Sequence, residues 1–565
     1  MTTSSQHAVT LQQLMESSRG DALGLQLSQM VKGLENPSDI TNIAFSNIRL
    51  DSRQVATNDV FVLLQSQSKN CQKSREYVSQ AAKTAAFILA EIDPLALFSS
   101  SDRQLDDTQP SAQQQLAALP CPVIYVPDIR EFLGSLIQAC LQHQQPAALP
   151  TVVAVTGTNG KTTISQLVAQ LTQLAGMSSA VMGTAGNGKL GALVQASHTT
   201  GDALAVQQFL YQMGAEDAEV LALEASSHGL DQQRLQGVPV KVAIYTNLSR
   251  DHLDYHADMA EYAAAKAKLF DKRHFPTLTH AIINIDDEHA QIMLETAQAS
   301  GLIVFTYSLY ASKDASFVAS AITPSLEGVD ISLHSQAENQ FEETQLTESQ
   351  LEDNQFANKP LNQINIVSPL LGRFNVANLL AAIAAAVALD ISLERIATLV
   401  PQLQGAIGRM QRVPSNDGCF IVDYAHTPDA LSQVLDSLRT HCHGQLWAVF
   451  GCGGDRDAGK RPLMAQAGLA GADQVILTAD NPRSEDPNAI LQDMQVGMDD
   501  EQYQRTHIEP ARQTAIAYAV SHASADDIVV IAGKGHETYQ EIHGVRHDFD
   551  DSIILQQALQ QAGRI

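Results

Sequence analysis

The stretch TVVAVTGTNGKTTISQLVAQL, residues 151–171, decides the fold prediction. Its first five residues are an apolar, β-branched run of the kind found in buried parallel strands. A glycine-rich turn and then a helical segment follow directly. In this order, backbone N–H groups converge at the positive end of a helix, where they bind phosphate oxygens. The stretch therefore predicts a phosphate-binding loop.

The loop itself offers two further groups for a nucleotide. Lys161 supplies a point charge for the outer phosphates, and Thr162 offers a hydroxyl to Mg²⁺. Val155 stands where the usual GxxxxGK[ST] loop has its first glycine. The alternative is a tight strand-to-helix turn with a surface lysine. The residues of the predicted loop are Gly157, Thr158, Asn159, Gly160, Lys161, Thr162 and Thr163.

Similar apolar runs recur along the chain, among them VFVLL (60–64), VLALEA (220–225), VAIYTN (242–247) and LWAVFG (446–451). Helical segments separate them, and this alternation predicts an α/β fold with a doubly wound sheet. At roughly 150 residues per domain, a chain of this length holds three to four domains. We expect an N-terminal α/β domain at 1–147, a central P-loop-type domain at 148–405 and a C-terminal Rossmann-like α/β domain at 406–565.

Composition narrows the class of protein. The formal net charge of -27 argues against binding of nucleic acid, whose phosphates need Lys and Arg. The six cysteines show no CxxC pair, and the N-terminus shows no signal peptide, so we expect a cytoplasmic monomer. The apolar stretch 376–389 is too short for a membrane span and predicts a buried helix. Residues 335–365 are rich in Glu, Gln and Asn, which predicts a solvated insertion without a catalytic role.

Two polar motifs follow predicted strands in the central region. In EASSHGL (224–230), Glu224 ends a strand, where it can bind Mg²⁺ or cap the next helix. The density of Asp and His in NLSRDHLDYH (247–256) suggests a metal or phosphate site, with loop capping as the structural alternative. Lys266 follows and, from its chemistry alone, is an ordinary exposed helix lysine.

A fourth motif, DNPR (480–483), lies in the C-terminal region. Its proline fixes φ, and the planar fork of Arg483 suits bidentate binding of a carboxylate. The alternative is a surface ion pair between Arg483 and Glu485 or Asp486.

Together the motifs resemble the Mur ligase family, and in particular its diaminopimelate-adding members. The resemblance spans about residues 152–537 and implies three domains, for the UDP end of the substrate, for ATP and for the amino acid. It implies an ATP-dependent amide ligase of peptidoglycan synthesis that adds meso-diaminopimelate to the D-Glu of UDP-N-acetylmuramoyl-L-alanyl-D-glutamate through an acyl phosphate. The motifs, in chain order, are GTNGKTT, EASSHGL, NLSRDHLDYH, GRFNVANLLAA (372–382), GRMQRV (408–413), DYAHTPDAL (423–431), GCGGDRDAGKRP (451–462), DNPR and GKGHE (533–537).

The resemblance also implies roles for single residues. Lys266 matches a lysine that CO₂ converts to a carbamate, which turns a cation into an oxygen ligand for Mg²⁺. The implied catalytic residues are Lys161, Glu224, His252 and Lys266, and the implied metal ligands are Thr162, Glu224, His252 and carbamylated Lys266. Besides the loop, Asn375, Arg409 and Asp423 would bind ATP. Leu50, Ser52, His198, Thr199, Thr200, Ser226, Gln232 and Arg234 would bind the UDP-linked substrate. Arg456, Asp480, Asn481, Pro482, Arg483, Gly533 and Glu537 would bind diaminopimelate.

The chain departs from the family pattern at two places. His198 stands where the family often has Asn, and Ser-Gln-Ser-Lys at 66–69 replaces Gly-His-Gln-Ala. The details of uridine recognition therefore stay open. Two alternative functions remain: a lysine-adding or folylpolyglutamate-type ligase, and a nucleotide-binding module that has lost catalysis. The intact Lys161, Glu224 and Lys266 argue against the second.

Overall fold

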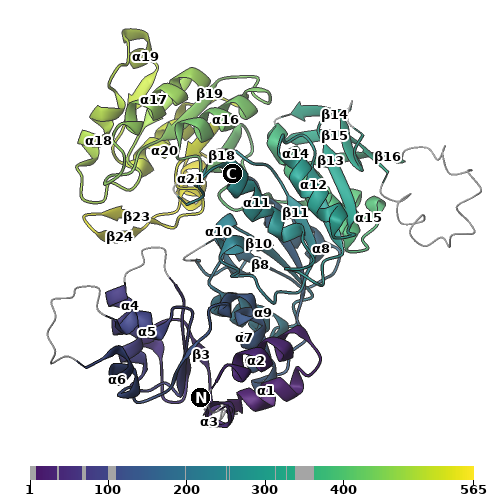
Figure 1. Cartoon of the computed structure of the whole chain (residues 1–565). Coiled ribbons are helices and arrows are strands. Elements are labelled where there is room, and N and C mark those ends of the chain that lie inside the picture. The colour runs from purple at the N-terminus through teal and green to yellow at the C-terminus, as the bar shows by residue number, and fades with distance from the viewer. Residues whose placement is uncertain are drawn as a thin grey trace, which may run out of the picture.

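The computed structural model confirms an α/β fold with a parallel sheet in each of three regions of the chain (Figure 1). The central region lies between the other two, with the N-terminal region at the bottom of the view and the C-terminal region at the top. The structure describes residues 8–34, 37–65, 71–99, 110–196, 199–249, 251–253, 255–311, 314–325, 327–336 and 362–565.

The N-terminal region is built on a four-stranded parallel sheet of order β3-β4-β5-β6. Every side chain of β4 and β5 is buried because helices cover both faces. The strands are β1 (Val9–Thr10), β2 (Ala44–Phe45), β3 (Ile48–Arg49), β4 (Val60–Leu63), β5 (Phe87–Ala90) and β6 (Val123–Tyr125). The helices are α1 (Leu11–Ser17), α2 (Ala22–Lys32), α3 (Ser38–Thr41), η1 (Ser52–Gln54), α4 (Cys71–Ala81), α5 (Pro94–Phe98), α6 (Ala112–Ala117), η2 (Ile129–Glu131) and α7 (Leu133–Gln144).

The central region holds a ten-stranded sheet of order β16-β15-β14-β13-β12-β11-β7-β10-β8-β9. Strands β8, β10, β7, β11, β12, β13 and β14 are parallel, and antiparallel strands close both edges. The strands are β7 (Thr151–Thr156), β8 (Ser179–Gly183), β9 (Gly186–Lys189), β10 (Val220–Glu224), β11 (Val240–Tyr245), β12 (His280–Asn284), β13 (Ile303–Ser308), β14 (Phe317–Ser325), β15 (Gly328–Ser335) and β16 (Asn362–Ser368).

Helices cover both faces of this sheet, as a doubly wound fold requires. One face packs against α8 and α14, and the other against α9, α11 and α12. The helices are α8 (Lys161–Leu174), α9 (Ala203–Ala215), α10 (Ser227–Asp231), α11 (Met259–Ala267), η3 (Lys268–Phe270), α12 (Ala290–Ala299), α14 (Arg373–Ala388), α15 (Leu393–Leu399) and η6 (Val400–Gln402).

The structure of this region tests two predictions made from the sequence. Helix α14 is buried in the core, as the apolar stretch 376–389 predicted. No helix in the described ranges is long and apolar enough to cross a membrane. The predicted insertion at 335–365 is wrong at both ends, because Ser335 is the last residue of β15 and residues from Asn362 onward form β16, which pairs with β15. The alternation of Ile364 and Ile366 with polar residues is the pattern of this strand. Residues 337–361 lie outside the described part of the chain.

The C-terminal region is a six-stranded sheet of order β17-β18-β22-β19-β20-β21, parallel except for β17. Fully apolar strands fill its centre, with helices on both faces. The strands are β17 (Gln411–Val413), β18 (Cys419–Asp423), β19 (Leu446–Phe450), β20 (Gln474–Leu477), β21 (Thr506–Ile508), β22 (Ile528–Ala532), β23 (Tyr539–Ile542) and β24 (Val545–Asp548). The helices are α16 (Pro428–Arg439), α17 (Lys460–Gly471), α18 (Pro487–Met494), α19 (Asp500–Gln504), α20 (Arg512–His522) and α21 (Asp551–Gln561).

The strand order predicts where ligands bind. In the central sheet β7 lies between β10 and β11, so the chain leaves β7 toward one side and later returns on the other. Ligands bind beyond the carboxyl ends of parallel strands at such a switch point. The loops after β7, β10 and β11 carry GTNGKTT, EASSHGL and NLSRDH, so the topology gathers these motifs at one edge.

A buried ion pair provides the first prediction. Arg512 and Asp551 are both fully buried, and the guanidinium donates two hydrogen bonds to the carboxylate, at 2.8 and 2.7 Å. Arg512→Met leaves a buried charge unpaired, so we expect a loss of about 3–5 kcal/mol in the free energy of unfolding. Trp447, the single tryptophan, lies in β19, so its fluorescence during urea unfolding reports on this region.

Arg439→Met is the matched control for this prediction. It removes the half-exposed Arg439–Asp473 pair of the same region, and we expect a loss of less than about 1 kcal/mol. Equal losses in the free energy of unfolding for the two variants would contradict the prediction.

Candidate active site

The loop between β7 and α8 has the shape of a phosphate-binding turn. Gly157 has φ 150° and Gly160 has φ 87°, both in the region that favours glycine. A Cβ atom at Gly157 would overlap the hydroxyl of Thr246. Two ammonium groups donate to the carbonyl oxygen of Gly157: that of Lys161 at 2.8 Å and that of Lys266 at 2.9 Å. The loop therefore concentrates positive charge at the start of α8.

The NLSRDH segment braces this loop from the neighbouring strand. Asn247 accepts hydrogen bonds from the backbone of Thr158 at 2.8 Å, through its carbonyl, and of Asn159 at 3.0 Å, through its side chain. The Thr246 hydroxyl donates to the carbonyl of Asn159 at 2.6 Å. Part of this motif is therefore structural, as the loop-capping alternative proposed.

Lys266 is not the exposed helix lysine that its chemistry alone predicted. It is 1% exposed, and its ammonium lies 4.5 Å from the ring centre of Tyr262. Burial, and then the nearby Lys161 ammonium, hold the pKa of Lys266 well below its usual value, and Asp251 opposes them. A helix pattern does not show which face a neighbouring loop covers, so this burial could not be predicted from the sequence.

Glu224 ends β10 and is also buried. Its carboxylate accepts hydrogen bonds from the backbone N–H of Thr184 at 2.9 Å and from the Thr184 hydroxyl at 3.1 Å. Burial raises the pKa of Glu224, whereas Lys161 and hydrogen bonds from Thr184 and Thr162 lower it. The helix-capping alternative for Glu224 is wrong, because Ser226 caps α10. Thr184 follows β8, and no motif in the sequence pointed to it.

His252 lies apart from this carboxylate. Its ring centre is 4.9 Å from that of His228 and 5.9 Å from that of Tyr262. No hydrogen bond or ion pair joins His252 to Glu224 or Lys266. Within the described ranges, no group of three or more His, Cys, Asp or Glu side chains is arranged to hold a metal ion. The oxygen atoms of Thr162 and Glu224 are the donors that suit Mg²⁺.

Asn375 lies on α14 beside the start of α8. It is buried, donates to the carbonyl of Leu371 at 2.8 Å and accepts from Asn378 at 3.1 Å. A Cβ atom at Gly160 would lie 2.6 Å from the Asn378 oxygen, so Asn378 contacts the loop directly. Asn378 was not among the predicted site residues, although it stands in the motif GRFNVANLLAA.

Arg409 and Asp423 approach from the C-terminal region. Asp423 accepts backbone hydrogen bonds from Met410 and Ala425, both at 2.7 Å. Burial raises the pKa of Asp423, and the Arg409 guanidinium opposes that shift. Arg409 lies 4.6 Å over the ring of Tyr424 and is near enough to Lys161 to lower the pKa of that lysine, which burial also lowers. The two residues thus stand at the boundary with the loop.

Five of the residues predicted for the UDP-linked substrate form one connected group. Thr200 donates to the carbonyl of Glu224 at 2.8 Å, and Arg234 donates to the carbonyl of Thr200 at 3.0 Å. Arg234 also donates to the side chain of Gln232 at 2.8 Å. The Thr199 hydroxyl accepts from Thr184, and the Thr200 hydroxyl accepts from the backbone of Ser226, both at 3.0 Å.

This group opens on a cavity of about 380 Å³ between the N-terminal and central regions. Gln232 and Arg234 line it together with Gln65, Arg130 and Asp202. The structure does not bring the other predicted residues here: Leu50 packs on the N-terminal core, and Ser52 is buried and donates to Gln80. His198 and residues 66–69 lie outside the described residues.

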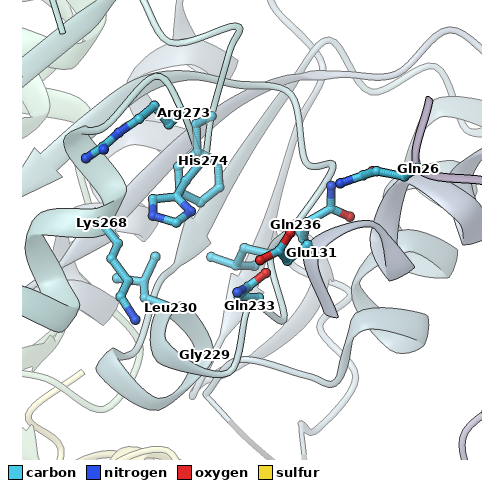
Figure 2. A pocket seen from close by; sticks show the side chains of 11 residues that line it. Gln26, Glu131, Gly229, Leu230, Gln233, Gln236, Lys268, Arg273 and His274 are labelled. Atoms are coloured by element: carbon cyan, nitrogen blue, oxygen red, sulfur yellow. The ribbon is translucent and has the colours of Figure 1, made fainter. Parts of the chain in front are cut away.

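A second cavity, of about 280 Å³, is lined in part by Gly229 and Leu230 of α10 (Figure 2). The side chains of Lys268 and His274 lie on one side of it, and those of Gln233 and Glu131 on the other. Lys268 is paired with Asp231 at 2.7 Å. This cavity contains none of the residues that the sequence predicted.

The DNPR turn follows β20. Arg483 has φ 52° and donates through its guanidinium to the carbonyl of Gly454 at 2.8 Å. The surface-pair alternative is wrong, because Glu485 pairs with Arg461 at 2.8 Å and Asp486 caps α18. In the part of the chain that the structure describes, no carboxylate forms an ion pair with Arg483. Its guanidinium therefore keeps free donors for a ligand.

The neighbours of Arg483 form a polar group. Asn481 donates to Glu537 at 2.9 Å. Asp480 is buried, which raises the pKa of its carboxyl, and a Cβ atom at Gly533 would lie 3.0 Å from it. Pro482 is buried beside them, and Arg456 is exposed. The turn and the GKGHE loop thus lie together at the carboxyl ends of β20 and β22.

Comparison with known proteins agrees with these motifs. Residues 155–386 match the family description Mur ligase middle domain, and residues 408–535 match Mur ligase, glutamate ligase domain. The chain is 41% identical to the UDP-N-acetylmuramoyl-L-alanyl-D-glutamate--2,6-diaminopimelate ligase of Xanthomonas oryzae pv. oryzae, over 95% of this chain and 97% of that protein. The ligase of the same name from Pseudomonas aeruginosa is 39% identical over 93% of this chain and 96% of its own length.

Solved structures give the same result. A structure of a ligase of that name has a TM-score of 0.69 at 41% identity and covers 95% of this chain and 99% of its own. Folylpolyglutamate synthase from Mycobacterium tuberculosis has a TM-score of 0.51 at 16% identity and covers 72% of this chain and 93% of its own. The second likeness is one of fold alone.

The overlap at Gly157 gives a prediction about ATP. Gly157→Ala moves the carbonyl that Lys161 and Lys266 share, so we expect ATP affinity to fall about tenfold or more. Gly176→Ala is the control, because Gly176 also has a positive φ, of 104°, but a Cβ there meets nothing within 4 Å. Titration calorimetry with ATP measures both variants. An equal loss of ATP affinity in the two variants would show that backbone strain, rather than the overlap with Thr246, causes the effect.

Proposed function

This chain belongs to the Mur ligase family, and from that premise we propose that it adds meso-diaminopimelate to the D-Glu of UDP-N-acetylmuramoyl-L-alanyl-D-glutamate. It is an ATP-dependent, ADP-forming ligase, and the reaction serves peptidoglycan synthesis. One observation carries the choice of amino acid: the Arg483 guanidinium forms no ion pair with a carboxylate of the described chain, and it belongs to the turn whose Asn481 is hydrogen-bonded to Glu537.

The chemistry of the donor fits this turn. Meso-diaminopimelate has a second centre with both an ammonium and a carboxylate, whereas lysine has no carboxylate at its far end. A guanidinium fork binds a carboxylate through two parallel hydrogen bonds. Glu537 offers the opposite charge for the ammonium. Arg456 and Gly533, and the turn from Asp480 to Pro482, would complete this site.

In the first step, a carboxylate oxygen of D-Glu attacks the γ-phosphorus of ATP, and ADP leaves. The product is an acyl phosphate. The protein mainly positions the groups and neutralises charge in such a transfer. Lys161 and the N–H groups of the loop at Gly157–Thr163 would hold the phosphates, with Asn375, Arg409 and Asp423 placing the rest of the nucleotide.

In the second step, the diaminopimelate amine attacks the acyl carbon. The tetrahedral intermediate loses phosphate, the amide forms, and the amine gives up a proton. The substrate carboxylate would reach the loop from the cavity that Gln232 and Arg234 line, with Thr199, Thr200 and Ser226 along the way. Leu50, Ser52 and His198 remain predictions for the UDP end of the substrate.

Magnesium is used by the family together with ATP, and when bound it neutralises the charge that develops on the phosphate oxygens. The residues present fit it: the Thr162 hydroxyl and the buried Glu224 carboxylate are hard oxygen donors. Mg²⁺ needs only one or two carboxylates, because water and phosphate supply its other ligands. The role of His252 as a ligand remains a prediction.

Lys266 is suited to the carbamate that the family resemblance implies. CO₂ adds to a neutral amine, and the product is a carbamate anion plus a proton. Burial and Lys161 hold the pKa of Lys266 well below its usual value, which supplies the neutral form. The carbamate would place a negative charge beside the Lys161 ammonium, which attracts it, whereas an ammonium on Lys266 would be repelled. The cytoplasmic location and the monomeric state also remain proposals.

Donor choice tests the proposed function. We compare phosphate release with meso-diaminopimelate, L-lysine and L-glutamate in the presence of ATP, Mg²⁺, bicarbonate and the UDP-linked substrate. Meso-diaminopimelate should give the highest kcat/KM. Arg483→Met should lower it about 10- to 100-fold, the effect of losing a hydrogen bond to a charged group. A preference for lysine, or an equal loss for all donors, would contradict the proposal, and no turnover at all would favour the non-catalytic alternative.

The carbamate is tested directly by NMR. Wild-type protein incubated with ¹³C-bicarbonate should show a carbamate carbon that is absent from Lys266→Arg, and the variant should lose ligation. Lys189→Met is the control, because Lys189 lies on β9 and donates to Glu216 away from the loop. A signal that persists in Lys266→Arg would place the carbamate on another amine.

A further inference from the structure

A buried lysine behind the DNPR turn has no role in the reaction described so far. Lys534, in the GKGHE loop, is 0% exposed, and its ammonium lies 3.2 Å from the Glu537 carboxylate and 3.3 Å from the Asn481 side-chain oxygen. It is also 3.7 Å from Asp480. We infer that Lys534 is a positioning residue, which holds Asn481 and Glu537 in the arrangement that receives the ammonium of the incoming amino acid. This inference rests on the proposed function.

Lys534 fixes which way the Asn481 amide faces. The amide oxygen accepts from Lys534 and, at 2.9 Å, from the backbone N–H of Glu541. The amide nitrogen is thereby directed to Glu537, to which it donates at 2.9 Å. A flipped amide would set its N–H₂ group against two donors. The lysine and one backbone N–H together leave Asn481 a single orientation.

Glu537 is held by one oxygen only. Its Oε2 atom accepts from both Asn481 and Lys534. Within the described part of the chain, no hydrogen bond occupies its Oε1 atom. A carboxylate anchored in this way keeps its rotamer and presents the second oxygen to a ligand. An ammonium group is the natural occupant, since it donates and carries the opposite charge.

The charges around Lys534 agree with a cationic ligand. Lys534 and Arg512 face three acidic groups: Asp480, Glu537 and Asp551. Counted as ionised, these five groups carry one net negative charge. Without Lys534 the excess would be two negative charges in a buried site, which is costly. The lysine therefore permits Glu537 to stay charged while leaving one negative charge for the donor.

The experiment is a comparison of Michaelis constants in the full-length protein. Lys534→Met keeps the length of the side chain and removes its charge. We expect its KM for meso-diaminopimelate to rise about tenfold or more, as for the loss of a buried charged partner, with the KM for ATP changing less than about twofold. Arg439→Met, which removes a surface cation of the same region, should change neither constant.

A double variant separates positioning from a general structural effect. In a Glu537→Gln background, Lys534→Met should raise the donor KM by about twofold or less, because its effect acts through Glu537. A full additive effect, or equal rises in the KM values for donor and ATP, would overturn the inference. So would an unchanged donor KM in a folded variant. If Lys534→Met does not fold, Lys534→Gln is measured in the same way.

The proposed function is judged separately, on the wild-type protein. If another amino acid proves to be the preferred donor, the proposed substrate is wrong. If lysine is that donor, the Lys534 series is run with lysine, because its side chain also brings an ammonium group besides the reacting amine. A rise in its KM supports the positioning role, and an unchanged KM in folded protein overturns it.

Discussion

Two ammonium groups that share one carbonyl oxygen set the conditions for the rest of the central region. Lys161 and the buried Lys266 both donate to Gly157, and Lys161 disfavours the charged form of Lys266. Such a cluster is stable only with negative charge nearby. Glu224 supplies one such charge, held by Thr184. A triphosphate and a carbamate would supply the rest, so the architecture is arranged around ligands that complete its charge balance.

The sequence predicted much of this arrangement because the phosphate loop depends on local order. A strand, a glycine turn and a helix are contiguous, and so are the strand-end motifs at Glu224 and Arg483. The parallel sheets followed from the apolar runs. The resemblance to a family then supplied roles, among them that of Lys266, which no local pattern could give. The structure leaves those roles as proposals, but it explains why Lys266 is chemically unusual.

What the sequence missed depends on contacts between distant segments. Thr184 reaches Glu224 across the sheet edge, and Asn378 meets Gly160 from a helix more than two hundred residues later. The strand at 362–368 was hidden because its polar residues face outward on an edge and resemble the preceding insertion. In the sequence, Lys534 is one residue of the glycine-rich motif GKGHE, and only the structure shows that it is buried among carboxylates. Propensity and periodicity carry no information on such pairings.

Gly408 and Arg409, between the central and C-terminal regions, connect the phosphate loop with the proposed donor site. Gly408 has φ 68°, and a Cβ there would overlap the backbone of His536, in the same loop as Lys534 and Glu537. Arg409, the next residue, is close enough to Lys161 to affect its pKa. A shift of the GKGHE loop on donor binding would therefore act directly on Arg409, the residue that we propose binds ATP. The overall charge of -27 conceals the positive charge of the phosphate loop, which suits the phosphates of a nucleotide. The proposed donor site instead offers one group of each sign, Arg483 for a carboxylate and Glu537 for an ammonium.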